Sequence, residues 1–570
     1  MHIDIVPNRG SPPAVLLRES FREGKKVKKR TLANLSSLSE SQVEAMRQVL
    51  KGKSMVPADQ LFQRVESFQQ GHVQAVRSAM QRLGFAELVA SRPSPERDRV
   101  CAMVAAQILE PASKLAYTRW WGTTTIPQTF GVGGASEDHL YEALDWLLQH
   151  QPTVEKKLAS RHLKEGGLVL YDLSSSYFEG VTCPLAALGH NRDGKKGKLQ
   201  VNYGLLTDSR GCPVSVSVFK GNSGDPKTLM PQVDKAKNEF DIQRLVLVGD
   251  RGMITQTQID QFRARDDHEG IDWIGALKSG AIRKLIDSKK IQMSLFDERN
   301  IFELTSPEFP NERLIACRNP ELAKLRAHKR QSLLAATQKE LEKVQRMVAK
   351  GKFEDRAAIG VRVGKVINKY KVAKHYALRI DDKSLSWQLR DERVAAEAAL
   401  DGLYIVRTSL DKAEMDTDST VRSYKRLSLV ERAFRSFKSI DLDVRPIRHR
   451  SENRVRAHIF LCMLAYYVKW HMNEAWRPLL FCNEDQAAKN RRDPVAPSLR
   501  SKDAMKKVAS RRLEDESTVH SFTTLIQRLA GIVRNICYIP ASKSGATFEI
   551  VTTPDKTQQR ALSLVEAIKM

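Results

Sequence analysis

Three acidic residues stand out because of where they lie in the sequence pattern. Asp172 follows an apolar strand pattern at residues 168–171, Asp250 follows a second one at 245–249, and Glu431 lies in a predicted helix. Taken singly, they could be a turn residue, a loop residue and a solvated helix charge. Together, three carboxylates could bind Mg²⁺ or Mn²⁺, and a pair of such ions stabilises the attacking and leaving oxygens of a phosphodiester displacement. The pattern therefore indicates phosphoryl transfer.

The predicted helix around Glu431 has two distinct faces. Tyr424, Glu431 and Lys438 are spaced seven apart, and at about 100° per residue such positions drift by only about 20° per step. An apolar face is centred about 80° from this stripe and consists of Leu427, Val430, Phe434 and Phe437. The helix can therefore bury its apolar face while Glu431 stays exposed at the rim.

Apolar segments around the two aspartates predict a mixed sheet. The expected strands are residues 168–171, 200–206, 214–219, 244–248 and 273–277, with one helix after Asp225-Pro226 and another after Asp250. This gives the order β-β-β-α-β-α-β, in which strand ends are rigid places for functional side chains. Asp225 is interpreted as a helix N-cap, and Glu179 and Asp208 as loop residues.

The composition favours a polyanionic partner. Lysine and arginine number 93 against 67 acidic residues, which gives a net charge of +26 and a pI near 9.7. Basic clusters lie at residues 25–30, 195–198 and 445–456, and nucleic acid is the first candidate partner, ahead of a membrane surface. The longest apolar run, Ile459–Val468, is too short to span a membrane, and the start has no secretory pattern. We expect a cytosolic protein.

The cysteine pattern argues against a scaffold of disulfides or structural zinc. Seven cysteines lie far apart with no C-x-x-C pair, so they are interpreted as reduced, buried thiols. His458 is interpreted as a core or rim histidine.

A chain of 570 residues is expected to form several domains of mixed α/β (α+β) class. We predict a small basic β-sheet at 1–34, a helical DNA-binding region at 35–165, the first part of the core at 166–280, an insertion without clear strands at 281–400, the second part of the core with the Glu431 helix at 401–475, and a basic, helical C-terminal region at 476–570.

The three acidic motifs resemble those of a known family. The block from Tyr424 to Lys438, YKRLSLVERAFRSFK, is similar to the YREK signature of bacterial insertion-sequence transposases. Asp172 in LYDLSSS and Asp250 in GDRGM resemble the first and second acidic motifs of the same DDE transposases. The resemblance covers about residues 165–475. The signature has arginine where this chain has Leu427, and the neighbouring Arg426 is a candidate replacement.

This resemblance implies a ribonuclease H-like catalytic core with a large insertion. Asp172, Asp250 and Glu431 would be the catalytic metal ligands for two Mg²⁺ ions, which Mn²⁺ could replace. The expected DNA contacts are Tyr424, Arg426, Arg435, Lys438 and Arg448.

The implied activity is cleavage at the ends of an insertion sequence and joining of the 3′ ends to target DNA. Its partners would be double-stranded DNA with terminal inverted repeats, target DNA and a second copy of the chain, at the nucleoid in a bacterial cytoplasm. Two alternatives stay open, namely an inactive DNA-binding regulator of the same fold and a ribonuclease H-like nuclease.

Overall fold

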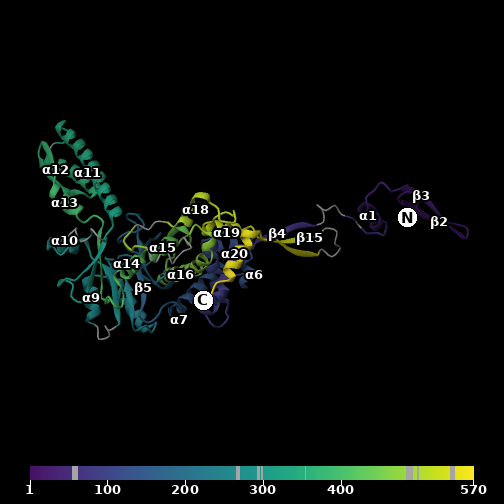
Figure 1. The fold of residues 1–570 in the computed structure, drawn as a ribbon, viewed down its shortest axis with the longest axis horizontal. Helices are drawn as coiled ribbons and strands as arrows, with labels where there is room; N and C mark the ends of the chain where they lie inside the picture. Colours follow the sequence, from purple (N-terminus) through teal and green to yellow (C-terminus); the bar gives the residue numbers. More distant parts are fainter. Residues whose placement is uncertain are drawn as a thin grey trace. The chain divides into compact units, whose positions relative to one another are not determined.

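The computed structural model describes residues 1–53, 55, 62–264, 270–291, 296, 299–353, 355–482, 492–496, 500–539 and 546–569. The chain forms two compact units (Figure 1). The first comprises Met1–Gln69 and Ile532–Thr553, and the second comprises Gln70–Gly531 and Pro554–Met570.

The described residues of the first unit form two antiparallel three-stranded sheets and one helix. One sheet consists of β1 (His2–Val6), β2 (Ala14–Glu23) and β3 (Lys26–Asn34), and the other of β4 (Gln63–Gln69), β15 (Val533–Tyr538) and β16 (Thr547–Val551). Helix α1 (Glu40–Leu50) begins at a capping box formed by Ser39 and Gln42, as its sequence predicts. The predicted boundary at residue 34 thus differs from that of the compact unit. Strand β4 falls in a stretch expected to be helical, and its mostly exposed side chains explain the missing apolar alternation.

In the second unit, helices that precede the large sheet in the sequence pack against helices that follow it. The first group is α2 (Gly71–Arg82), α3 (Phe85–Val89), α4 (Pro95–Leu109), α5 (Lys114–Trp120), the 3-10 turn η2 (Trp121–Thr123), α6 (Ile126–Phe130) and α7 (Glu137–His162). The second group is α16 (Glu452–Ala475), the 3-10 turn η7 (Arg477–Leu479), α18 (Lys502–Ser510), α19 (Phe522–Ala530) and α20 (Lys556–Glu566). Helix α16 packs against α4 and α7, and it is buried on nearly all sides, as its continuous apolar sequence requires.

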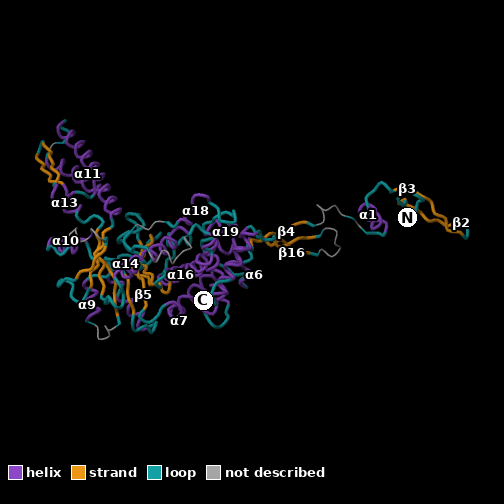
Figure 2. The backbone as a smooth tube through the Cα atoms, viewed as in Figure 1, coloured by secondary structure: helices purple, strands orange, loops and turns teal. Residues whose placement is uncertain are grey.

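An eight-stranded sheet forms the core of the second unit (Figure 2). Its predicted part consists of β5 (Gly167–Tyr177), β6 (Gln200–Thr207), β7 (Pro213–Lys220), β8 (Leu245–Val248) and β9 (Ile271–Ala276), with the 3-10 turn η3 (Asp225–Thr228), α8 (Met230–Asn238) and α9 (Gln256–Arg263) between them. The spatial order is β7-β6-β5-β8-β9, antiparallel from β5 to β7 and parallel from β5 to β9. The predicted ribonuclease H-like core is confirmed.

The insertion is only partly separate from this sheet. Strands β10 (Ile301–Leu304) and β11 (Arg313–Arg318) join it through β14 (Leu403–Thr408), although no clear strands were expected between residues 281 and 400. Helix α10 (Ser279–Asp287) covers these strands through a shared apolar cluster. The remaining elements are α11 (Pro320–Ala349), α12 (Arg356–Tyr370), the 3-10 turn η5 (Ala373–His375), β12 (Tyr376–Asp381), β13 (Ser384–Leu389) and α13 (Asp391–Ala398). Helices α11 and α12 and strands β12 and β13 share a small apolar core of their own, and α11, α12 and α13 lie together in Figure 1.

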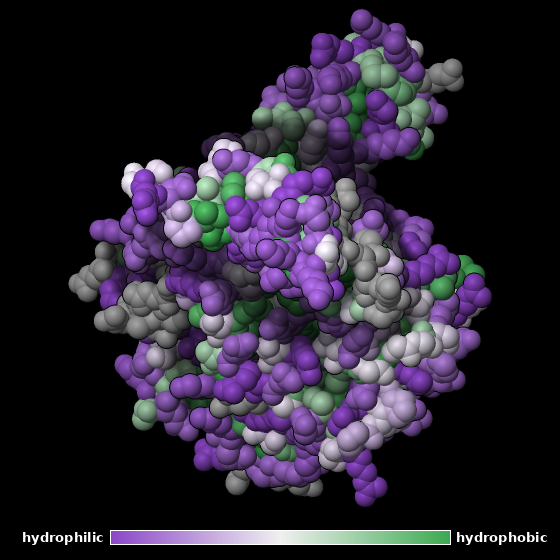
Figure 3. All heavy atoms as spheres, turned by 90° about the vertical axis from the view of Figure 1, so that its right-hand side faces the viewer, coloured by the Kyte–Doolittle hydropathy of each residue, from purple (hydrophilic) through white to green (hydrophobic). Residues whose placement is uncertain are grey.

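None of the described helices is both long and apolar enough to cross a membrane. Hydrophilic residues cover most of the face shown in Figure 3, and the apolar residues on it form small, separate groups.

Helix α7 is tied to the sheet by a buried carboxylate. Glu155 is fully buried, and its Oε1 accepts hydrogen bonds from the backbone N–H of Val216 (3.0 Å) and from Nε2 of Gln151 (2.8 Å). Its other oxygen pairs with Lys235 of α8. One side chain therefore joins a helix of the first group, strand β7 and helix α8.

We expect Glu155→Ala to lower the free energy of unfolding of the second unit by about 3 to 5 kcal/mol, because it leaves the Lys235 charge and a strand N–H without their partner. Denaturant unfolding of the purified chain measures this. The control is Glu142→Ala, an exposed residue on the same helix, which should change stability by less than about 0.5 kcal/mol. Equal effects of the two variants would contradict the assignment.

Candidate active site

The register of two parallel strands brings Asp172 and Asp250 to the same level of the sheet. Leu170 of β5 is paired with Val248 of β8, the last residue of that strand. Asp172 and Asp250 each lie two residues beyond this pair. Asp172 is not at the end of its strand, as the sequence suggested, because β5 continues to Tyr177 along β6. Its functional position comes instead from the end of β8, which leaves that edge of β5 open.

Asp172 is a largely buried carboxyl group among other negative charges. Its pKa is raised to about 7, chiefly by burial, and the nearby charges of Asp250 and Glu431 contribute to the rise. The backbone N–H of Leu173, 2.8 Å from Oδ1, and the positive charge of Arg192 act in the opposite direction. The three predicted carboxylates therefore lie close enough to interact electrostatically, at a place where added positive charge would be favourable.

Glu431 is presented by a helix that packs directly on β5. The predicted helical block is divided into α14 (Thr417–Lys425), α15 (Leu427–Arg435) and a π-helical turn, η6 (Ser436–Ile440). Helix α15 contacts β5 (Figure 1). Its predicted apolar face is buried, with exposed fractions of 9% for Leu427, 0% for Val430 and Phe437 and 5% for Phe434, while Glu431 itself is exposed.

Tyr424 contacts the same group of carboxylates. Its hydroxyl lies 3.4 Å from Oδ1 of Asp250. Burial raises the pKa of this phenol, and the charges of Asp250 and Glu431 contribute to the rise. The phenol is therefore a neutral hydrogen-bond donor beside the second aspartate.

A fourth carboxylate lies beside the site, and sequence reasoning misjudged it. The prediction that Asp225 is a helix N-cap is wrong, because Asp225 is the first residue of η3 and makes no capping bond. Its Oδ1 instead accepts a hydrogen bond from Arg192 (2.6 Å). A Cβ built on Gly252 would lie 3.9 Å from Oδ2 of Asp225 and equally far from Oδ2 of Asp250, so the two side chains flank one backbone position.

Lys438 points to a buried aspartate that the sequence analysis did not single out. Asp193 lies in the segment between β5 and β6, and its side chain is 1% exposed. Its Oδ1 accepts hydrogen bonds from Lys438 (2.9 Å) and Arg445 (2.6 Å), and its Oδ2 accepts one from the backbone N–H of Tyr177 (2.9 Å). Burial lowers the pKa of Lys438 although Asp193 opposes the shift. Asp193 has no strand-end or helical pattern that could have revealed it.

The other basic residues predicted to contact DNA are more widely distributed. Arg426 lies at the junction of α14 and α15, and Arg435 is exposed at the end of α15. Arg448 is exposed and lines a hollow of about 800 Å³ together with Arg450, Arg454 and Tyr141. The carboxylates of the candidate site are not among the residues that line this hollow.

Two family models and one solved structure are similar to the chain. A family model described as "Transposase DDE domain" matches residues 180–468, and one described as "IS1634 family transposase, N-terminal domain" matches residues 3–59. Among solved structures, a piggyBac transposase synaptic complex with hairpin DNA has a TM-score of 0.32 and 10% sequence identity, covering 81% of this chain and 76% of that chain. No curated protein matches the chain.

The first of these family models spans just over half of the chain and contains Asp193, Asp225, Asp250, Glu431 and Lys438. The second covers nearly all of the first sheet and the whole of α1. The chain belongs to the DDE transposases of insertion sequences.

Proposed function

We propose that this transposase cleaves DNA at the ends of its own element and joins the freed 3′ ends to target DNA. The observation that carries the proposal is the matched position of Asp172 and Asp250 on neighbouring parallel strands, with the Glu431 helix packed on the first of them. The proposed substrate is double-stranded DNA with terminal inverted repeats, handled by two copies of the chain in a bacterial cytoplasm.

The donor set fits divalent cations of the Mg²⁺ or Mn²⁺ type. Asp172, Asp250 and Glu431 supply only hard oxygen ligands, and the raised pKa of Asp172 supports the proposal because positive charge would favour its ionised form. We propose these three residues as the ligands of two ions. Bound ions would make a water molecule or a 3′ hydroxyl a better nucleophile and offset the charge that develops at the phosphate.

The surrounding residues would position the DNA strand and the carboxylates. Tyr424 would donate a hydrogen bond to Asp250 or to a phosphate oxygen near it. Arg192 holds Asp225 and, through its charge, favours the ionised form of Asp172. Arg426, Arg435 and Arg448 would bind phosphates and so give affinity without reading base sequence.

Lys438 would act through the protein rather than only through DNA. Its ammonium group and that of Arg445 share one oxygen of Asp193, and the neighbouring residue Arg192 bonds to Asp225 beside the carboxylates. We propose that this pairing holds the segment between β5 and β6 against the end of the Glu431 helix. Lys438 is then a positioning residue.

The first test compares isosteric variants of the three carboxylates. In Mg²⁺, Asp172→Asn, Asp250→Asn and Glu431→Gln should each reduce cleavage and joining by at least about a thousandfold, because each removes a ligand charge worth several kcal/mol in the transition state. Linear DNA carrying the inverted repeats that flank the gene is the substrate, and gel analysis of cleaved and joined strands gives the rates.

Asp260→Ala is the matched control, since Asp260 is exposed on α9 between the same core strands, and it should keep full activity. Undiminished cleavage by the carboxylate variants would reject the site. Binding without cleavage by the unaltered protein would favour a regulator, and cleavage without joining would favour a nuclease.

The raised pKa of Asp172 predicts how stability depends on pH in the absence of metal. Between its ordinary pKa of 3.8 and its folded value of about 7, the folded state keeps a proton that the unfolded state has released. The contribution of this group to stability therefore falls as pH rises through that window. In chelator, the stability advantage of Asp172→Asn over the unaltered protein should therefore be about 1 to 3 kcal/mol larger at pH 8 than at pH 5.

Denaturant unfolding at the two pH values measures this difference, and adding Mg²⁺ at pH 8 should shrink it by stabilising only the unaltered protein. An equal advantage of the variant at both pH values would contradict a titrating Asp172.

The role of Lys438 is tested through its partner. If Lys438 acts by pairing with Asp193, then Asp193→Asn and Lys438→Met should each slow cleavage by about tenfold, equivalent to about 1.4 kcal/mol, and the double variant should be no slower. DNA affinity should change little in Asp193→Asn.

Arg435→Met is the contrasting variant, because Arg435 is exposed on the same helix. It should weaken DNA binding and reduce the slope of log affinity against log salt by about 0.9. Full cleavage activity in Asp193→Asn would show that Lys438 does not act through this ion pair.

A further inference from the structure

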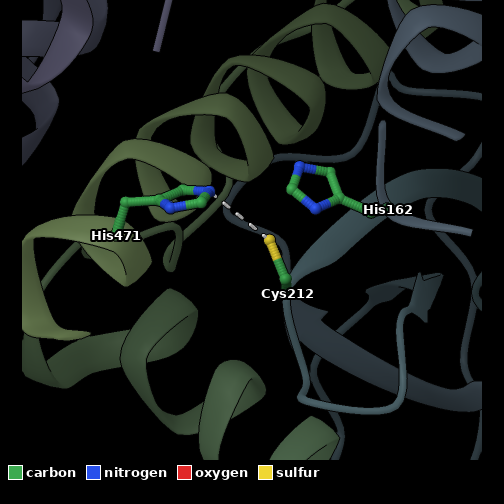
Figure 4. Close-up of side chains that lie close together, drawn as sticks. All are labelled: His162, Cys212 and His471. Atoms are coloured by element: carbon green, nitrogen blue, oxygen red, sulfur yellow. Dashed lines mark hydrogen bonds between the residues drawn. The ribbon is translucent and has the colours of Figure 1, made fainter. Parts of the chain in front are cut away.

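Two histidines and a cysteine from distant parts of the sequence meet inside the second unit (Figure 4). His162 is the last residue of α7, Cys212 directly precedes β7, and His471 lies on α16. One donor atom of each lies within 4.8 Å of the other two, and the Cys212 sulfur is 3.8 Å from Nε2 of His471. The described residues contain no other such group of three histidine, cysteine or acidic donors.

Cys212 is held in place by the turn that precedes it. Oδ1 of Asp208 accepts the backbone N–H groups of Arg210 (2.8 Å) and Cys212 (2.9 Å), and the N–H of Asp208 donates to the carbonyl of Cys212 (3.0 Å). Gly211 completes the turn with a φ of +82°, a conformation that glycine adopts most easily. The backbone that carries the sulfur is therefore held in place before any ligand binds.

The two imidazole rings lie on either side of this sulfur in Figure 4. His471 reaches it with Nε2, and Nε2 of His162 is hydrogen-bonded to the Tyr467 hydroxyl (3.1 Å). When Nε2 of His162 donates to this hydroxyl, Nδ1 is left with a lone pair for a metal. Metal-binding histidines commonly have their second ring nitrogen fixed in this way.

The protonation states of these three side chains favour metal binding over an ion pair among them. Burial lowers the pKa of His162 to about 4 and that of His471 to about 3, so both rings are neutral near pH 7. Burial raises the pKa of the Cys212 thiol well above its usual range, so without a metal the group is three neutral polar side chains with one weak sulfur contact. The charged side chains that act on it are Arg161, Arg210, Asp208 and Glu474.

We propose that His162, Cys212 and His471 bind one zinc ion. Two imidazoles and a thiolate are the donors of zinc sites, whereas Mg²⁺ prefers oxygen. A tetrahedral zinc ion holds such donors about 3.5 Å apart, so the 3.8 Å contact already fits and small side-chain rotations close the remaining distances of up to 4.8 Å. As the zinc–sulfur bond forms, the thiol proton leaves to solvent, and water completes the fourth position.

The zinc ion would brace the helix that presents Glu431. A Cβ on Gly211 would lie only 2.8 Å from Cβ of Leu429, so the turn before Cys212 packs tightly against α15, two residues from Glu431. The ion joins this turn to the ends of α7 and α16. It is thus a structural site, chemically separate from the three carboxylates.

Metal content and stability test this site in the full-length protein. Protein purified without chelator, or loaded with one equivalent of zinc and desalted, should contain about one zinc per chain by mass spectrometry of the elements. Cys212→Ala and His471→Ala should each retain less than about a tenth of this. Cobalt substitution should give a sulfur-to-cobalt charge-transfer band that is lost in Cys212→Ala. Because metal that binds only the folded state stabilises it, a strong chelator should lower the melting temperature of the unaltered protein but not of Cys212→Ala.

Two control variants separate this site from general effects. Cys317→Ala removes a thiol that is equally buried and donates to the backbone carbonyl of Ile315, and it should keep its zinc even if it is less stable. Asp250→Asn disrupts the carboxylate group and should also keep its zinc. The proposal is overturned if the unaltered protein takes up no zinc, or if Cys212→Ala retains as much zinc as Cys317→Ala.

Discussion

The pairing of β5 with β8 is the constraint on which the active site depends. Because Leu170 and Val248 are partners in a parallel ladder, the residues two positions further along must lie side by side where one strand ends and the other continues. A shift of one residue in either strand would turn one aspartate to the opposite face of the sheet. The apolar sequence of β8, buried at all four positions, fixes this register because a shifted strand would bury polar residues instead.

Bringing carboxylates together in a partly buried place is unfavourable because their negative charges repel each other. Two successive groups of basic residues offset this repulsion. Arg192 counters the charge of Asp172 and binds Asp225 directly. One residue further along, Asp193 is buried with Lys438 and Arg445 around it. A single segment between β5 and β6 therefore links the acidic group to basic residues that follow the Glu431 helix. Removing one charge leaves its neighbours unpaired, so these side chains act as a unit.

The core and its three carboxylates could be predicted because their signals are local. Apolar runs define β5 and β8, the 3.6-residue period defines the buried face of α15, and both lie within a few residues of Asp172, Asp250 and Glu431. Asp225 was misjudged because the same dipeptide, Asp-Pro, also starts capped helices. Strand β4 was not predicted because an exposed strand lacks the alternation of apolar and polar residues. The partners of Asp193 were not predicted because an ion pair between distant residues produces no characteristic spacing in the sequence.

The proposed zinc site also depends on contacts between residues that are far apart in the sequence, which sequence patterns do not reveal. The absence of a C-x-x-C pair argued against structural zinc, yet that argument applies only when neighbouring residues supply the ligands. Here the donors are separated by 50 and 259 residues, and the fold assembles them because α7, the turn before β7 and α16 pack into one core. Soft donors in an interior site and hard donors at the sheet edge select different ions. With zinc bound, the contact between Gly211 and Leu429 would make the position of Glu431 depend on the packing around that ion. The proposed chemistry of Glu431 would depend on the separate Mg²⁺ or Mn²⁺ ions at the carboxylates.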